Sequence, residues 1–217
     1  MKKTCYLIIL FFNSLVAFGQ DTIDIHTNQK ICDCIHSLKN PTEESSAACF
    51  SDLILKDSVF LTIVSKLEDK SEQAGNELGR RLFENVSLEL IGSCNDWYIL
   101  MENLRVSDFK TLNVDSIKKE IVKIDSVDIS KRTSNFYTFR GVMYFQTSEL
   151  NKAIADFDMA LNLNKNEIQS IFFKAWSLEI KGEYDNAILL YNQLVLLTNN
   201  PQFKIFEAIA KRKKHGI

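Results

Sequence analysis

The sequence has little proline and little glycine, 2 and 7 among 217 residues. So few of both exclude a collagen-like chain and a Pro- and Gly-rich disordered chain, and they leave few turn residues for a protein of many short strands. Hydrophobic residues make up 46% of the chain, enough to form a buried core in one or two domains. Because long amphipathic stretches alternate with few turn signals, the sequence predicts an all-α fold.

A strong charge of one sign is also lacking, since the formal net charge is −2 at pH 7. Removal of Lys2 and Lys3 with a leader would change it only to about −4, which indicates neither a nucleic-acid partner nor an anionic membrane. After the first twenty residues, no apolar run is long enough to span a membrane.

Motifs of catalytic sites are missing as well. The sequence contains no Ser/His/Asp set, no paired-acid motif and no glycine-rich phosphate loop. Gly75 and Gly79 lie four residues apart on one face of a long predicted helix, Glu72 to Gly92, where we interpret them as a close contact with another helix. We therefore expect no enzymatic activity, no cofactor and no metal.

The first nineteen residues have the pattern of a signal peptide. A basic start at Lys2 and Lys3 precedes an apolar stretch from Tyr6 to Phe18, and small residues at Ala17 and Gly19 suit cleavage before Gln20. Cys5 precedes the apolar stretch, so it does not fit the lipid-bearing cysteine of a lipoprotein. The pattern predicts export to the periplasm or the outside of the cell, and the alternative is an uncleaved N-terminal anchor.

The chain contains two successive copies of one pattern. Each position of the first copy is separated from its equivalent in the second by the same number of residues, as Gly141 is from Ala175. Each copy has two amphipathic helical periods separated by a short turn, and small residues recur at the same places. The matched positions are Tyr137, Gly141, Tyr144, Ala153, Phe157 and Ala160 in the first copy, and Ile171, Ala175, Leu178, Ala187, Tyr191 and Leu194 in the second. Small residues allow two antiparallel helices to approach closely, so each copy predicts a helical hairpin.

This pattern resembles the tetratricopeptide (TPR) repeat, whose period of about 34 residues matches the offset. The departures are Tyr137 and Ile171 where many TPR motifs have tryptophan, Lys165 in place of the usual proline, and a late proline at Pro201. The resemblance implies an α-α superhelix with repeats at 134–167 and 168–201. Residues 202–217 are expected to form a capping helix with a basic end, Lys211 to Lys214, which complements the helix dipole or, as an alternative, contacts an anionic partner.

The same resemblance implies a concave groove lined by the first helix of each repeat. Its carried-over positions are Asn135, Thr138, Val142, Phe145, Gln169, Phe172, Trp176 and Glu179. Phe172 and Trp176 form an aromatic pair suited to anchoring a peptide or helix. The alternative is that the N-terminal domain or a linker helix covers these residues. The basic and Asn pattern with which some TPR domains hold a C-terminal carboxylate is absent.

Residues 20–105 are predicted to form a separate helical domain that contains four cysteines. One helix ends at Asn40-Pro41, a second begins at Thr42 with an incomplete capping box because Ser45 stands where glutamate is preferred, and further helices are expected around Val59–Leu67 and Cys94–Leu104. A linker with one short helix, residues 106–133, leads to the repeats, and the alternative is one continuous helical stack.

The four cysteines, Cys32, Cys34, Cys49 and Cys94, predict two disulfides in an exported chain. Cys32 and Cys34 point about 200° apart on a helix, so they need different partners. Cys32–Cys49 with Cys34–Cys94 and Cys32–Cys94 with Cys34–Cys49 both remain open, with a slight preference for the second. A metal site that uses His26 and His36 has the wrong ligand spacing for structural zinc.

An exported cysteine-containing helical domain followed by such repeats is similar to a group of secreted TPR proteins of Gram-negative bacteria, which implies no defined activity. The expected function is non-catalytic binding of an unidentified protein or peptide in the concave groove, without nucleic acid. The alternative is a thiol- or metal-dependent enzyme that uses the N-terminal cysteine cluster.

Overall fold

The protein is all-α, as the sequence predicts. A computed structural model describes residues 25–57, 61–62, 65, 71–107 and 113–216. Within these ranges the regular elements are ten α-helices and one short 3-10 helix. The chain divides into two compact units, Met1–Met101 and Glu102–Ile217. The predicted signal peptide and most of the helix expected at Val59–Leu67 lie outside the described residues.

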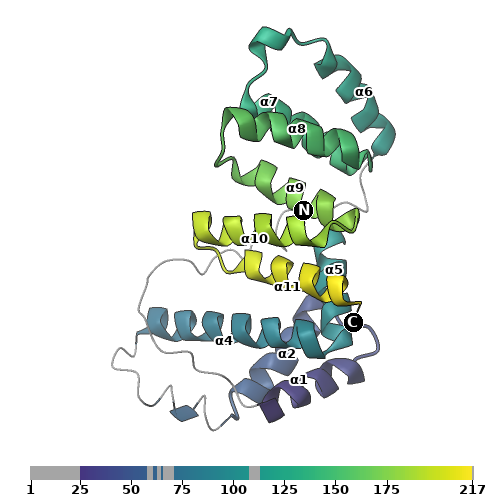
Figure 1. Ribbon diagram of the computed structural model, residues 1–217. Helices are drawn as coiled ribbons and strands as arrows, with labels where there is room; N and C mark the ends of the chain where they lie inside the picture. The colour runs from purple at the N-terminus through teal and green to yellow at the C-terminus, as the bar shows by residue number, and fades with distance from the viewer. Residues whose placement is uncertain (1–24, 58–60, 63–64, 66–70, 108–112, 217) are drawn as a thin grey trace. The chain divides into compact units, whose positions relative to one another are not determined.

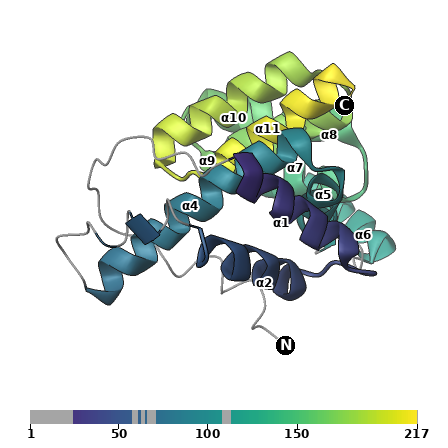
Figure 2. The ribbon, with the colours of Figure 1, turned by 90° about the horizontal axis from the view of Figure 1, so that it is seen from below.

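The first unit is built from α1 (Ile25–Ser37), α2 (Glu43–Ile54), α4 (Glu72–Ser93) and the beginning of α5 (Asn95–Ser107). Helix α1 contacts both α2 and α4 (Figures 1 and 2). Three aromatic rings meet in the core of this unit. The centroid of the Phe50 ring lies 5.0 Å from that of Phe83 and 4.8 Å from that of Trp97. Around them, the buried apolar side chains include Ile31, Ile35, Leu82, Val86, Leu90, Ile91 and Leu100.

Helix α2 begins with a complete capping box, which corrects the sequence prediction. The Thr42 side chain accepts a hydrogen bond from the Ser45 backbone N–H, and the Ser45 hydroxyl accepts one from the Thr42 backbone N–H at 2.9 Å. Serine therefore satisfies the donor that glutamate usually satisfies at this position.

Gly75 and Gly79 do not mediate the close helix contact that we expected. A Cβ atom on either residue would meet nothing within 4 Å in the part of the chain that the structure describes. Both glycines are exposed on α4, and the prediction was wrong because a shared helical face does not reveal whether that face is covered.

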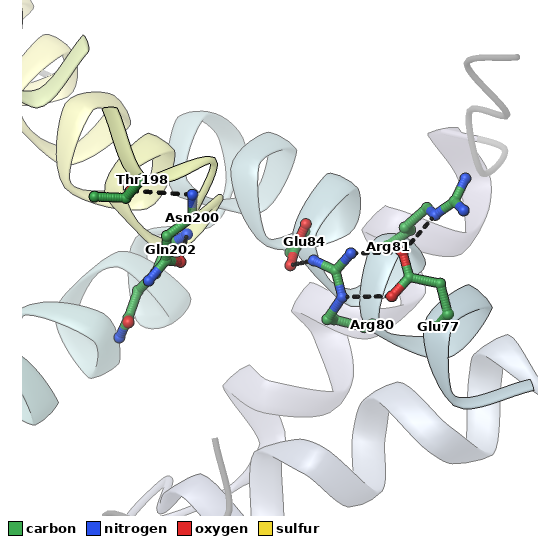
Figure 3. A network of polar contacts seen from close by, with 7 residues as sticks. All are labelled: Glu77, Arg80, Arg81, Glu84, Thr198, Asn200 and Gln202. Carbon is green, nitrogen blue, oxygen red and sulfur yellow. Dashed lines mark hydrogen bonds and ion pairs between the residues drawn. The ribbon is translucent and has the colours of Figure 1, made fainter. Parts of the chain in front are cut away.

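Charged side chains on α4 form a ladder along the helix (Figure 3). Glu77 accepts hydrogen bonds from Arg80 at 2.6 Å and from Arg81 at 3.0 Å, and Arg80 also pairs with Glu84. The hydrogen bond from Arg80 is the main cause that lowers the pKa of Glu77. Spacings of three and four residues bring these charges together on the helix surface, where each pair adds a few tenths of a kcal/mol, roughly 0.2–0.5.

The second unit is a stack of successive helices. After the end of α5 come α6 (Val114–Asp125), the 3-10 helix η1 (Ile129–Lys131), α7 (Ser134–Gln146), α8 (Leu150–Leu163), α9 (Ile168–Ile180), α10 (Tyr184–Thr198) and α11 (Gln202–His215). Each helix from α6 to α11 contacts the next one along the chain, and they lie side by side in Figure 1. The stack therefore consists of two hairpins, α7–α8 and α9–α10, with one helix on each side.

The positions that match between the two copies form the interior of these hairpins. Ala153, Ala175 and Ala187 have no exposed surface. A Cβ atom on Gly141 would lie 2.6 Å from the ring of Phe157, closer than real Cβ atoms come to their neighbours. At this position the small residue is required because the helices approach so closely.

The turns inside the two hairpins repeat as well. Ser148 and Gly182 occupy equivalent positions of the two copies, and both have positive φ, at 63° and 80°. Glu149 donates its backbone N–H to Tyr144 at 2.8 Å, and Glu183 donates in the same way to Leu178 at 2.9 Å. The same local geometry thus closes both hairpins, once with the glycine that suits it and once with serine.

Candidate interaction site

The four cysteines form two bridges in the first unit. Cys32 of α1 is joined to Cys94 at the end of α4, and Cys34 of α1 is joined to Cys49 of α2. Of the two connectivities left open by the sequence, the structure has this one. The described residues include no group of three or more His, Cys, Asp or Glu side chains placed to hold a metal ion.

Half of the groove residues expected from the sequence are buried in the second unit. Thr138 lies within hydrogen-bond distance of Ser170, 2.7 Å between the two hydroxyl oxygens, and Phe145 packs its ring 4.9 Å from Trp176. Trp176 and Glu179 are 3% and 2% exposed. Val142 is half-buried in the same apolar cluster. These residues therefore do not present an open surface.

The cover comes from the end of α5 and from α6, the helix in the predicted linker. Ile121 of α6 is a buried member of the apolar cluster of Trp176, and Val106 of α5 packs against this cluster. Arg105 of α5 lies over the Trp176 ring, 4.8 Å from its centroid, and 5.7 Å from that of Phe206. A linker helix and the end of α5 thus occupy the inner part of the predicted groove, the alternative that the sequence left open.

Arg105 and Glu179 form a bidentate ion pair at this place. Nη1 and Nη2 of Arg105 donate to the two carboxylate oxygens of Glu179 at 2.9 and 2.7 Å. Tyr191 donates its hydroxyl to the same carboxylate at 2.9 Å, and Lys213 donates to it at 2.8 Å. A buried carboxylate needs such partners, because an unpaired charge in the interior is strongly unfavourable.

Burial and pairing act on these groups in opposite directions. Burial alone would raise the pKa of Glu179, but the hydrogen bonds and charge of Arg105, with those of Lys213, hold it below its ordinary value. Burial would likewise lower the pKa of Arg105, yet Glu179 raises it. Burial and the nearby Glu179 both raise the pKa of Tyr191, well above its usual value. The cluster is therefore ionised at neutral pH, with the tyrosine as a neutral donor.

The lysines of the basic C-terminal cluster have partners inside the second unit. Lys213 bridges Glu179 and Glu102, whose carboxylate lies 2.5 Å from its ammonium group, and Lys214 pairs with Asp185. Lys211 pairs with Glu207 one turn earlier on α11. The cluster therefore contributes to packing of the last helix as well as to its dipole.

The accessible part of the first-helix face lies at the beginnings of α9 and α11. An open cavity of about 430 Å³ is found there, and its lining includes two of the predicted groove residues, the exposed Gln169 and the half-buried Phe172. Its full lining is Glu167, Ile168, Gln169, Phe172, Gln202, Phe203 and Phe206. Asn135, at the beginning of α7, is also exposed.

Hydrogen bonds hold the loop before α11 (Figure 3), and Gln202 at its end lines this cavity. The backbone N–H of Asn200 donates to the Thr198 hydroxyl at 3.1 Å, and that of Gln202 donates to the Asn200 side chain at 2.9 Å. Since Gln202 and the following Phe203 line the cavity, this loop positions them.

Several residues of this site carried no signal in the sequence. Arg105 lies 74 residues from Glu179 along the chain, and no periodicity links the two. Phe203 and Phe206 were visible only as the apolar face of a terminal helix. Lys213 stood in a charged run, where one lysine cannot be distinguished from its neighbours.

The protein is all-α, and its second unit is a stack of helical hairpins. An aromatic cavity lies at the beginnings of α9 and α11 in this stack. Comparison of the chain with models of protein families, with curated proteins and with solved structures gave no match. Among the described residues no helix is both long and apolar enough to cross a membrane.

Proposed function

We propose that this protein is an exported, non-catalytic TPR protein that binds another protein through a peptide or a helix. Three observations support the TPR assignment: the repeated sequence pattern, the burial of its small residues, and the repeated hairpin turns. The two disulfides support export, because such bonds persist in oxidising compartments outside the cytosol.

The observation that carries the binding function is the cavity at the beginnings of α9 and α11. Phe172, Phe203 and Phe206 provide its apolar wall, while Gln169 and Gln202 provide polar groups beside it. Its volume of about 430 Å³ is in the range of ligand sites, roughly 300–1,000 Å³. A site of this composition suits an apolar side chain of a partner with its backbone amides hydrogen-bonded at the edge.

Partner capture from the native cell envelope tests the proposal. Ile168→Glu changes an exposed cavity residue, 45% accessible, at the first turn of α9, where an acidic residue is compatible with the helix. Leu189→Glu is the matched control, because Leu189 is 67% exposed on α10 and does not line the cavity. Circular dichroism confirms that both variants fold.

We expect the wild type and Leu189→Glu to retain one specific protein that Ile168→Glu loses. If all three retain the same protein, the binding surface lies elsewhere and the cavity assignment is wrong. If none retains a protein, the interaction function itself is contradicted. The alternative of a thiol-dependent enzyme gains no support from the four cysteines, since the structure joins them in disulfides.

A further inference from the structure

A buried cluster around Glu179 joins charged groups of α5, α9 and α11 beside the Trp176 ring. We propose that Glu179, Trp176, Phe206 and Lys213 form a recognition site for a helix that carries an acidic residue and an arginine three positions apart. In the structure Glu102 and Arg105 of α5 occupy this site, and a partner helix with the same pair replaces them. This inference goes beyond the proposed function, because its site is the ion-pair cluster around Glu179 and not the cavity at the beginnings of α9 and α11.

The guanidinium of Arg105 contacts both a carboxylate and an aromatic ring. Its two terminal nitrogens meet the two oxygens of Glu179 at 2.9 and 2.7 Å. Its central carbon, Cζ, lies 4.8 Å from the centroid of the Trp176 ring. A bidentate contact with a carboxylate, combined with an aromatic ring below the cation, favours arginine over lysine, whose compact charge cannot form the bidentate contact.

Lys213 contacts Glu102, the acidic residue of the pair. Its ammonium group lies 2.5 Å from Glu102 and 2.8 Å from Glu179. When residues 102–107 withdraw, Glu179 keeps Lys213 and Tyr191 as partners but loses Arg105, and Lys213 loses Glu102. An incoming helix gives both charges a new partner if it brings an acid for Lys213 and an arginine for Glu179, at the spacing of Glu102 and Arg105.

Replacement is feasible because charged contacts of this kind give specificity more than stability. The loss of hydration of Glu179 and Arg105, which are 0% and 4% exposed in their side chains, offsets much of their attraction. A partner that supplies the same two charges therefore replaces the contact at little net loss. Withdrawal of residues 102–107 removes Val106 and Arg105 from Trp176, so the incoming helix must also cover this ring. The contacts of the helices α7 to α11 with one another remain.

The probe for the test is a fluorescent, end-capped peptide with the sequence of α5, Asn95–Ser107, 13 residues long. Two further peptides have lysine or alanine in the place that corresponds to Arg105. Their binding to the full chain is measured by anisotropy for the wild type, for Arg105→Ala and for Arg105→Lys. Arg105→Lys keeps a cation beside Glu179, so it provides a folded chain if Arg105→Ala does not fold.

We expect the arginine peptide to bind whichever of the two variants folds at least about tenfold more tightly than it binds the wild type, whose site is filled by its own Arg105. The lysine and alanine peptides are expected to bind at least about tenfold more weakly than the arginine peptide. Adding Glu179→Gln to the variant is expected to remove the preference for arginine. Equal affinity for the three peptides, or equal binding by wild type and variant, would overturn the proposal.

The two proposals can fail separately. If Ile168→Glu still abolishes capture of a native partner while no peptide distinguishes the chains, the cavity binds a partner and only the arginine site is wrong. If the arginine peptide binds as expected but no native partner is captured, the site exists and the proposed function is contradicted.

Discussion

The two units of this protein are stabilised by different means. Both disulfides that join described residues lie in the first unit, where they connect α1 to the end of α4 and to α2. The second unit instead repeats one hairpin geometry and encloses an ion-pair cluster between α5, α9 and α11. Covalent cross-links thus stabilise the first unit, whereas repeated packing and buried ion pairs stabilise the second.

The core of the first unit contains buried polar groups without partners among the described residues. The hydroxyl groups of Ser46 and Ser87 are buried with no hydrogen-bond partner among the residues that the structure describes. A buried hydroxyl that lacks a partner costs roughly 1–3 kcal/mol. In the second unit, the buried hydroxyls of Thr138 and Ser170 lie within hydrogen-bond distance of each other, while Nε of Arg105 is buried without a hydrogen bond to the described residues. In the first unit, restriction of the unfolded chain by the two disulfides offsets costs of this kind.

Removing the disulfides is expected to have the largest effect and to act on the first unit alone. By the chain-entropy relation, the 62-residue separation of Cys32 and Cys94 contributes about 4 kcal/mol, and the 15-residue separation of Cys34 and Cys49 about 3 kcal/mol. Hydrogen exchange with and without a reductant measures this, region by region. We expect protection to disappear in α1, α2 and α4 and to persist in α7 to α10.

Two double variants, each without one disulfide, distinguish the contributions of the two bridges to stability. Cys32→Ser/Cys94→Ser is expected to lower the free energy of unfolding more than Cys34→Ser/Cys49→Ser, in line with the longer loop. Equal loss of protection in α7 to α10 after reduction would show that the second unit depends on the bridges, against this view.

In the second unit the largest single-residue effect is expected at Glu179. Glu179→Gln leaves Arg105 buried with only part of its pairing, so we expect the free energy of unfolding to fall by about 3–5 kcal/mol. Glu120→Gln is the control, because Glu120 pairs with Lys123 on the exposed surface of α6, a contact typically contributing about 0–1 kcal/mol. Denaturant unfolding followed by circular dichroism measures both. Similar losses for the two variants would contradict the assigned role of the buried cluster.

The same cluster gives the second unit a dependence on acid. The pKa of Glu179 is lower in the folded chain than its ordinary value, so its contribution to stability is complete above the ordinary value. The contribution is lost as the pH falls through the lower, folded pKa. We expect the wild type to lose stability on acidification over this window more steeply than Glu179→Gln. Parallel pH profiles for the two chains would show that Glu179 is not the group responsible.

Glycine substitutions extend the comparison to packing. Gly141→Ala places a methyl group against the Phe157 ring, and we expect it to destabilise the protein by about 1–3 kcal/mol. Gly75→Ala places the same group in open space on α4, where alanine is the better helix former and stabilises by about 0.5–1 kcal/mol. Midpoints of urea unfolding for the two variants should move in opposite directions. A stabilising Gly141→Ala would mean that the hairpin is less closely packed than its repeat pattern indicates.

Gly141 and Gly75 also show what could be predicted from the sequence and what could not. The all-α class and the buried positions shared by the two copies could be predicted, because helical periodicity is local and each copy repeats it. The role of Gly141 was predictable since its counterpart Ala175 is small, whereas Gly75 had no second copy to test its interpretation. The covering of Trp176 by Arg105 was not predictable, because it depends on how α5 and α9, two segments far apart in the sequence, meet, and no local pattern records such a contact.

The smallest expected effect concerns the two hairpin turns, which differ only in how well their residues suit one geometry. Ser148 has φ of 63°, a conformation that costs a residue with a side chain roughly 1 kcal/mol, whereas Gly182 adopts φ of 80° without this cost. Ser148→Gly removes the strain but also gives the unfolded chain more freedom, so we expect a net gain of at most about 0.5 kcal/mol. Gly182→Ala is expected to lose about 1 kcal/mol, and thermal unfolding of both variants against the wild type measures the difference. If Gly182→Ala were neutral while Ser148→Gly destabilised, the two turns would not be equivalent, and the repeat would extend to the helices but not to their connections.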